Sequence, residues 1–547
     1  ANSRSKQRYI MAKKEFHDGE DEPDEADETT RLLGSIPPYR SVVELLEPPE
    51  QYKSRWRSIR VMYLTMFLSS VSFSICMSSI WPYLQILEPD ADTNLLGWVV
   101  AIYSLGQLIA SPIFGFWANF RAKSREPLVV SMIINILANF LYVYLESIPP
   151  KRLGYLMLAR ALIGFGAGNV AVVRSYVSGA TTIKERTGSM AIMSAFQATG
   201  FIIGPLIQTA MVPVGFPGPV HSSFLHMDMY TSPAILSAIV GIINVILIIT
   251  IFREHRVSDE EKVVTIQDSE PSIKEEIEEA TMDYSPDYPA VLSCIFLFFV
   301  VLFVFAVFET ITTPLSMHMF SWTKEKATLY NGIILGVAGI ISIAVFGVIR
   351  LISQRVNERY LLLGGFCFCL CGFLVYLPWG NHFPPIQYVA ITDSLNTSSH
   401  INYTYTAILD VNTTTQLSTT TMEATGCPIN YLWCRDTPAI YLAQLLGGTL
   451  LIAIGYPTCN VISYTIYSKI LGPKPQGLWM GWLTASGSLA RTLGPVFVTL
   501  VYDAYGPRVT FATMCGIIIV TIIVQIIVFK KLVPFKLKSP ISQERRF

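Results

Sequence analysis

The chain has 547 residues, of which 51% are hydrophobic and 15% are charged; its mean hydropathy is +0.44 and its formal net charge is zero. Soluble domains carry about 25% charged residues and rarely expose large apolar patches, so this composition excludes an ordinary water-soluble fold. The zero net charge gives no argument for a nucleic-acid partner. The nine cysteines are scattered, which argues against a disulfide-framework domain.

Twelve apolar segments are long enough for membrane-spanning helices, which need about 20 mainly apolar residues. In chain order they cover residues 60–87, 95–118, 127–147, 153–178, 190–213, 230–252, 290–316, 328–352, 360–380, 437–467, 476–503 and 508–531. Their continuity favours helices, because the strands of a membrane barrel alternate in hydropathy. No signal peptide is visible, so we expect the first helix to target the chain to the membrane. The sequence predicts an all-α polytopic membrane protein with two six-helix pseudo-repeats.

The predicted organisation follows from where polar segments interrupt the helices. It consists of a cytosolic tail (1–55), a first six-helix half (56–252), an acidic cytosolic linker (253–289), a second half (290–532) with a polar lumenal loop (381–436), and a short cytosolic tail (533–547). Basic residues gather before the first helix and in the even-numbered loops, whereas the first loop carries Glu88, Asp90 and Asp92. The positive-inside rule therefore predicts that both termini are cytosolic.

The polar loop 381–436 supports this orientation independently. It contains three N-glycosylation sequons, which begin at Asn396, Asn402 and Asn412. Glycosylation occurs on the lumenal side, where this orientation places the loop. Cys427 and Cys434 lie near its end, and spacing alone leaves it open whether they form a disulfide.

The N-terminal tail contains a candidate sorting signal. Glu28 lies four residues before the pair Leu32 and Leu33. Adaptor proteins bind such a leucine pair in an apolar pocket while a basic patch contacts the carboxylate. The alternative is a chance leucine pair in an acidic tail, and we favour sorting.

The two halves show a weak internal repeat. Gly164 and Asn169 in the fourth helix have the same spacing as Gly455 and Asn460 in the tenth. Gly–Pro pairs recur in helices five and eleven, at Gly204-Pro205 and Gly494-Pro495, where we expect bends or close contacts. Transporters built from such repeats place the substrate site between them, near the middle of the membrane.

The segment 115–125, between helices two and three, resembles the loop signature of the major facilitator superfamily. Its candidate gating residues are Gly115, Asn119, Arg121, Lys123 and Arg125. The resemblance implies a twelve-helix transporter fold and extends over about 52–535. Asn119 replaces the usual Asp and Ala122 a usual Gly, which puts a charge-based gating lock in doubt.

Segments 52–60, 168–176 and 472–487 are similar, more closely, to a lysosomal member of the superfamily. This similarity implies residence in late endosomes and lysosomes. It also implies solute transport or anion permeation across that membrane.

Charged residues inside predicted helices are costly in lipid, so they face a cavity or a partner. We expect Glu309 to be a proton site, because a low-dielectric cavity favours the protonated carboxyl, and Arg160 to be an anion or counter-charge site. Equally open is an ion pair between Glu309 and an arginine that holds the halves together. Arg491 is interpreted as structural, and Arg174 as a residue that extends toward the cytosolic surface.

Neutral polar side chains complete the candidate pathway. Asn169, Asn460, Gln107 and Tyr456 could donate or accept hydrogen bonds with a solute, and helix-to-helix bonding is the alternative for each. His318 is interpreted as a solvated loop histidine rather than a pH sensor. We find no nucleophile–base pattern and no zinc-ligand spacing, so neither an enzyme nor a metal or other cofactor is predicted.

Two functions remain open. The first is a carrier that moves a small solute by alternating access, coupled to protons through Glu309. The second is a channel-like anion pathway, with chloride as the ion, lined by the intramembrane arginines. A non-transporting scaffold is less favoured, because the intramembrane charges would then serve only to pair.

Overall fold

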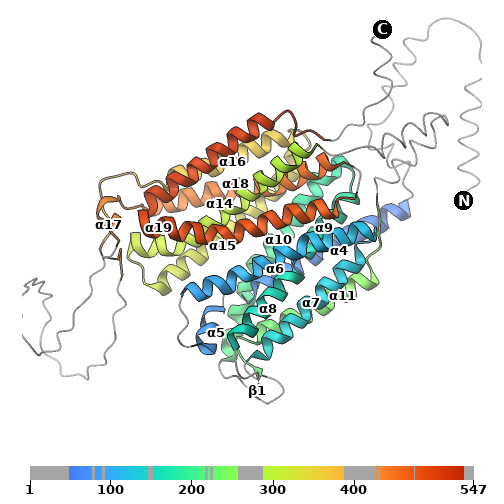
Figure 1. Cartoon of the computed structure of the whole chain (residues 1–547), viewed down its shortest axis with the longest axis horizontal. Coiled ribbons are helices and arrows are strands. Elements are labelled where there is room, and N and C mark those ends of the chain that lie inside the picture. Colours follow the sequence, from blue (N-terminus) through green and yellow to red (C-terminus); the bar gives the residue numbers. More distant parts are fainter. Residues whose placement is uncertain are drawn as a thin grey trace, which may run out of the picture. The chain divides into compact units, whose positions relative to one another are not determined.

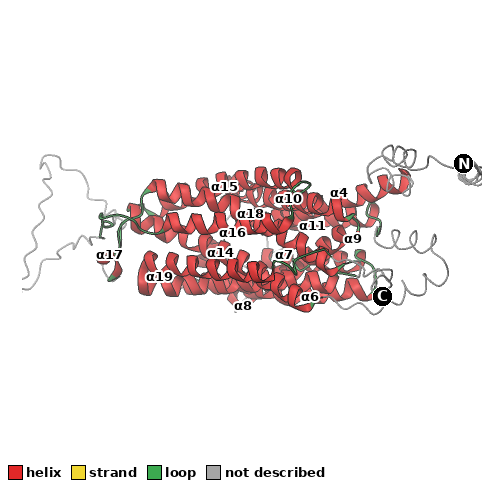
Figure 2. Cartoon of the chain, turned by 90° about the horizontal axis from the view of Figure 1, so that it is seen from above, coloured by secondary structure: helices red, strands yellow, loops and turns green. Residues whose placement is uncertain are grey.

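The computed structural model describes residues 49–76, 80–88, 93–145, 152–215, 218, 220–221, 226–256, 287–386, 425–428, 431–472 and 475–534. These residues form helices almost throughout (Figure 2). One short antiparallel pair joins β1 (Val220–His221) to β2 (His226–Met227). The sorting residues Glu28, Leu32 and Leu33 and the sequon residues Asn396, Asn402 and Asn412 lie outside the described residues.

The chain divides into two compact units, Ala1–Trp56 and Arg57–Phe547. The first unit is described from Pro49, where helix α4 (Pro49–Ser74) begins. Its Arg55 guanidinium carbon lies 5.3 Å from the Tyr52 ring centroid and 5.8 Å from that of Trp56. The helix therefore starts before residue 56, where we predicted the tail to end, because hydropathy does not register a polar helical turn.

The second unit holds two groups of helices. The first half continues from α4 through α5 (Ile80–Leu87), α6 (Thr93–Phe120), α7 (Arg125–Val143), α8 (Arg152–Gly166), α9 (Asn169–Gly179), α10 (Ile183–Met211), the short η3 (Val212–Val214) and α11 (Ser232–Thr250). The second half comprises α14 (Tyr288–Phe320), α15 (Lys324–Ile352), α16 (Glu358–Tyr376), α17 (Trp433–Asp436), α18 (Leu442–Leu471) and α19 (Gly477–Val528).

Ten helices in the described part of the chain are long and apolar enough to cross a membrane. One of them, α19, has 52 residues and is interrupted at Gly506, whose φ is +78°. This break falls between the predicted segments 476–503 and 508–531. Glycine tolerates positive φ, and the following Pro507 cannot supply a backbone N–H to continue the ladder.

The predicted twelve helices are thus confirmed only in part. The predicted first helix, 60–87, is broken after Ser74 into α4 and α5 and is absent from the ten. The predicted fourth helix, 153–178, is among the ten as the span Arg152–Gly179, although a turn at Ala167 and Gly168 separates its two parts, α8 and α9.

The internal repeat recurs in the packing. A Cβ on Gly204 of α10 would collide with Ser74 of α4, and one on Gly494 of α19 would lie 2.8 Å from the Cβ of Ala306 on α14. Both glycines therefore allow equivalent helices of the two halves to approach closely. Pro205 and Pro495 follow them inside helices that continue on both sides.

The two halves meet through a limited set of helices. α6 and α9 pack against α19, and α10 packs against α15 and α18. Figure 1 shows the halves converging at the ends near α9 and separating toward α5 and α17. We call the converging end, with residues 119–124, 178–187, 468–472 and 475–477, the α9 face; it is the face predicted to be cytosolic.

Candidate functional site

A cavity of about 130 Å³ lies between the two halves. Its walls come from α4, α6, α9 and α10 of the first half and from α14, α15, α18 and α19 of the second. These are four helices from each half, as expected for a site between repeats. Among the predicted pathway residues, the lining includes Gln107, Asn169, Tyr456, Asn460 and Arg491.

Arg174 contributes a positive charge to this cavity from α9. Its side chain is 2% exposed. One Nη donates to Oε1 of Gln197 at 2.8 Å, and the guanidinium carbon lies 3.7 Å from the ring centroid of Tyr464 on α18. The last contact is a cation–π interaction that joins the two halves. Arg174 therefore does not extend to the surface as predicted, because α18 covers it.

Arg491 contributes a second positive charge from α19. Its Nη2 donates to Oε1 of Gln107 on α6 at 2.9 Å. The same oxygen accepts from the Ser488 hydroxyl at 3.0 Å, while Nε2 of Gln107 donates to the Ala167 carbonyl at 3.1 Å. Gln107 thus holds Arg491 in place across the interface. Arg491, interpreted from sequence as structural, faces the same cavity as Arg174.

The positive charges are not balanced within the cavity wall. The described lining residues include no Asp or Glu. Glu309 lies on α14, is exposed, and is close enough to Arg491 to interact with it electrostatically. Both residues belong to the second half, so an ion pair between them would not hold the halves together.

Arg160 lies outside this cavity. It is 1% exposed on α8, and its guanidinium carbon is 5.3 Å from the ring centroid of Tyr103. Tyr103 lines the cavity, so it lies between Arg160 and the space that a solute would occupy. Arg160 can influence a bound anion only from behind this ring.

The α9 face is closed by backbone contact. A Cβ on Gly115 of α6 would collide with the carbonyl of Gly477 at the start of α19. The Asn119 amide donates to the Pro475 carbonyl at 3.2 Å, and its oxygen accepts from the Gly477 N–H at 2.7 Å. An aspartate could not donate to Pro475, so the Asn at this position suits a neutral hydrogen-bonded closure.

Further contacts strengthen this closure. The Ser178 hydroxyl contacts that of Ser468 and donates to Oε1 of Gln476 at 2.7 Å. Thr187 of α10 donates to the Glu358 carboxylate at 3.2 Å, and this carboxylate also pairs with Lys469 at 2.5 Å. Side chains from both halves therefore seal the α9 face.

The basic residues of the predicted gating loop bond within the first half. Arg121 pairs with Glu126 at 3.0 Å on the surface, and Arg125 donates to the carbonyl of Ile249. Lys123 is exposed. In this conformation the loop contacts the second half through Asn119 rather than through these charges.

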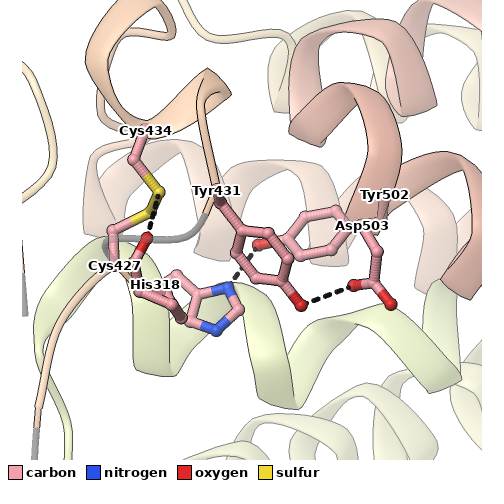
Figure 3. Close-up of a disulfide and its surroundings, with 7 residues drawn as sticks. His318, Cys427, Tyr431, Cys434, Tyr502 and Asp503 are labelled. Atoms are coloured by element: carbon pink, nitrogen blue, oxygen red, sulfur yellow. Dashed lines mark hydrogen bonds between the residues drawn. A yellow bond between two sulfur atoms is a disulfide. The ribbon is translucent and has the colours of Figure 1, made fainter.

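A disulfide joins Cys427 to Cys434 beside α17 (Figure 3). Near this disulfide the Cys427 N–H donates to the Pro385 carbonyl at 2.8 Å, and Cys427 forms an isolated parallel bridge with Ile386. Ile386 and Cys427, which flank the segment 387–424 in the sequence, therefore lie side by side.

His318 packs beside this disulfide rather than lying in a solvated loop. Its Nδ1 is 3.0 Å from the Tyr502 hydroxyl, and the two rings are stacked (Figure 3). The neighbouring Tyr431 hydroxyl donates to Asp503 at 3.1 Å. Burial, together with the Asp503 charge, raises the pKa of Tyr431. Trp433 covers the cluster and contacts Gly506, at the break in α19.

Residues 62–427 match the model of the Major Facilitator Superfamily. The chain belongs to this superfamily. It is 51% identical over 513 residues to "Major facilitator superfamily domain-containing protein 8" of Xenopus laevis. This alignment covers 94% of this chain and 98% of that protein. It is 23% identical over 307 residues to "Multidrug resistance protein 2" of Bacillus subtilis (strain 168). This alignment covers 55% of this chain and 68% of that protein.

Solved structures show the same fold. The human organic anion transporter MFSD10 (TETRAN) aligns with a TM-score of 0.57 and 13% identity, covering 88% of this chain and 100% of that one. The proton:xylose symporter XylE aligns with a TM-score of 0.59 and 11% identity, covering 89% and 98%. At these identities the likeness extends to the fold and not to the solute.

Proposed function

We propose that this chain moves a small solute across its membrane by alternating access. The cavity between the two halves carries the proposal: eight helices line it, and packed backbone closes it on the α9 face. A carrier must hold its solute between two gates that open in turn. The structure then corresponds to a state that is shut toward the α9 face.

The proposal includes proton coupling through Glu309. Glu309 lies on the membrane-spanning helix α14, where protonation would make its side chain neutral. Its electrostatic interaction with Arg491 links it to the cavity wall. Protonation would remove one negative charge beside Arg491 and so change the charge that a bound solute meets.

We further propose a lysosomal and late endosomal location with both termini in the cytosol. The acidic dileucine pattern at Glu28, Leu32 and Leu33 supports recognition by adaptor proteins. The basic residues of the even-numbered loops and the three sequons of loop 381–436 support the orientation. The lipid bilayer and a small solute are the remaining partners.

An anion-permeable, channel-like pathway is the second candidate. Arg174 and Arg491 favour it, because both place a permanent positive charge in the cavity. The contacts between the two halves that close the α9 face support the carrier, because alternating access uses a gate of this kind.

The deciding experiment uses Leu32→Ala with Leu33→Ala, which we expect to bring the protein to the plasma membrane. Whole-cell current is recorded at acidic bath pH while chloride is exchanged for a large impermeant anion. A carrier gives no current whose reversal follows chloride, and saturable solute uptake instead. A current whose reversal potential follows the chloride gradient, and which Arg491→Gln abolishes, would establish the anion channel. Surface protein with neither current nor uptake would overturn both.

A further inference from the structure

The cavity contains one guanidinium from each half. Arg174 comes from α9 and Arg491 from α19, and both side chains line the same space. Tyr456 of α18 is near enough to interact electrostatically with both of them. In the described lining no carboxylate lies between the two charges. A ligand in this space therefore meets positive charge from both halves at once.

The hydrogen-bond partners of the two arginines within the cavity are neutral side chains. Gln197 accepts from Arg174 and Gln107 accepts from Arg491, each through one amide oxygen. The Ser194 hydroxyl also accepts from both Nη atoms of Arg174, at 3.4 Å each. A guanidinium has five N–H donors, and these partners use only some of the Nη donors of each arginine. Both side chains line the cavity, so the remaining Nη donors are the ones that a ligand would meet. Carboxylate and sulfonate oxygens match such donors in charge and geometry.

Aromatic side chains form a large part of the remaining lining. Phe73, Phe201, Phe298 and Phe346 surround the polar groups, and Tyr456 stacks on Phe305 with ring centroids 4.1 Å apart. A cavity of about 150 Å³ accommodates benzene. At about 130 Å³ this cavity is far larger than one chloride ion and fits a compact ligand with an apolar body.

We propose that the cavity binds one small organic acid anion, whose acidic group bridges Arg174 and Arg491 and whose apolar body lies against the aromatic wall. The proposal rests on the alternating-access function proposed above and names its class of substrate. One anion would contact a positive charge from each half. Its binding would therefore affect the movement of the two halves that opens the α9 face.

This arrangement favours exchange of one anion for another across the membrane over release of an anion with an empty return step. Opening the α9 face separates α9 from α18 and breaks the contact of Arg174 with Tyr464. In the empty protein both guanidinium groups then lack a carboxylate in the described cavity wall, and positive charge in a low-dielectric interior is costly. A bound anion compensates them. The loaded carrier should therefore change conformation faster than the empty one, so that an anion on the opposite side accelerates efflux.

Binding is tested first, on the purified full-length chain, with radiolabelled ethanesulfonate as the probe. The sulfonate stays ionised at neutral pH, and ethanesulfonamide is its neutral counterpart. We expect unlabelled ethanesulfonate to compete at least tenfold better than the sulfonamide. Arg174→Gln and Arg491→Gln should each weaken binding about tenfold or more, the scale of a charge-assisted hydrogen bond. Arg508→Gln, which changes an exposed arginine of the same α19, should stay within twofold.

Folding of each variant is checked by the thermal unfolding midpoint without ligand. If a glutamine variant is unstable, the matching Arg→Lys variant is measured, because it keeps the charge but loses the planar fork. We expect it to retain the preference for sulfonate over sulfonamide while binding more weakly. Equal competition by the two compounds, or binding unaffected by either arginine, would overturn the proposed substrate class.

Exchange is tested in proteoliposomes loaded with the labelled sulfonate. External unlabelled sulfonate should accelerate efflux at least tenfold, and external sulfonamide should not. An efflux rate that is the same with and without the external anion would refute exchange. Saturable uptake of neutral solutes without anion binding would refute the substrate class and leave alternating access standing. If cells with the Leu32→Ala, Leu33→Ala protein at their plasma membrane transport no solute, the proposed function itself is refuted.

Discussion

Replacing Asn119 with alanine removes both hydrogen bonds that its side-chain amide makes across the two halves. A hydrogen bond contributes about 1 kcal/mol net, so we expect the closed α9 face to lose about 2 kcal/mol relative to the open one. A difference of about 1.4 kcal/mol is tenfold, so the open population should rise about thirtyfold. The close packing of Gly115 against Gly477 remains in this variant, so the loss of stability of the closed state comes from these two hydrogen bonds alone.

The assay measures maleimide modification of Ser468→Cys from the side of the α9 face. Ser468 is fully buried in the closed conformation, so its reaction rate reports the open population. The exposed Cys367 and Cys371 are replaced by serine beforehand. Asn119→Asp is the comparison: its carboxylate still accepts from Gly477 at the N-terminus of α19, a favourable place for negative charge. It should therefore accelerate modification less than alanine does. An alanine variant within threefold of the parent would show that Asn119 does not hold this face shut.

Three further predictions concern other parts of the chain. Glu309→Gln should make solute uptake independent of bath pH between acidic and neutral values; uptake that still rises with acidity would exclude Glu309 as the proton site. Cys427→Ser should lower local stability near Cys434 by about 2–3 kcal/mol, from the entropy of the short closed loop. Faster limited proteolysis there would show it, and unchanged digestion would contradict it. Leu32→Ala with Leu33→Ala should raise surface biotinylation several-fold, and continued intracellular retention would rule out the sorting signal.

The helix content and the division into halves could be predicted because hydropathy and the Gly–Pro repeat depend only on local sequence. The breaks were harder to predict. Gly506 lies in a short gap between two apolar segments, yet the backbone stays helical on both sides of it. The first predicted helix ends at Ser74 and restarts at Ile80, where no hydropathy change marks the break.

The cavity charges show what one sequence leaves undetermined. Arg160 and Arg174 are about four helical turns apart, so on one unbroken helix they would share a face. The turn at Ala167 and Gly168 separates α8 from α9, and only Arg174 reaches the cavity. One signal was available: Ala167, Val170 and Arg174 have the same i, i+3, i+7 spacing as Thr484, Gly487 and Arg491. Recognising it required knowing which face of each helix lines the cavity.

The base of the segment 387–424 has a practical consequence. Ile386 and Cys427 are paired, and the disulfide to Cys434 and the contact of Ala439 with His382 fix the chain around them. Paired strands lie about 5 Å apart. A small rigid domain with neighbouring termini, exchanged for residues 387–424, would be attached at two adjacent points rather than at one hinge. Such a chimera would add an asymmetric mass outside the bilayer to guide particle alignment in electron microscopy, and it would leave α16 and α18 connected as they are.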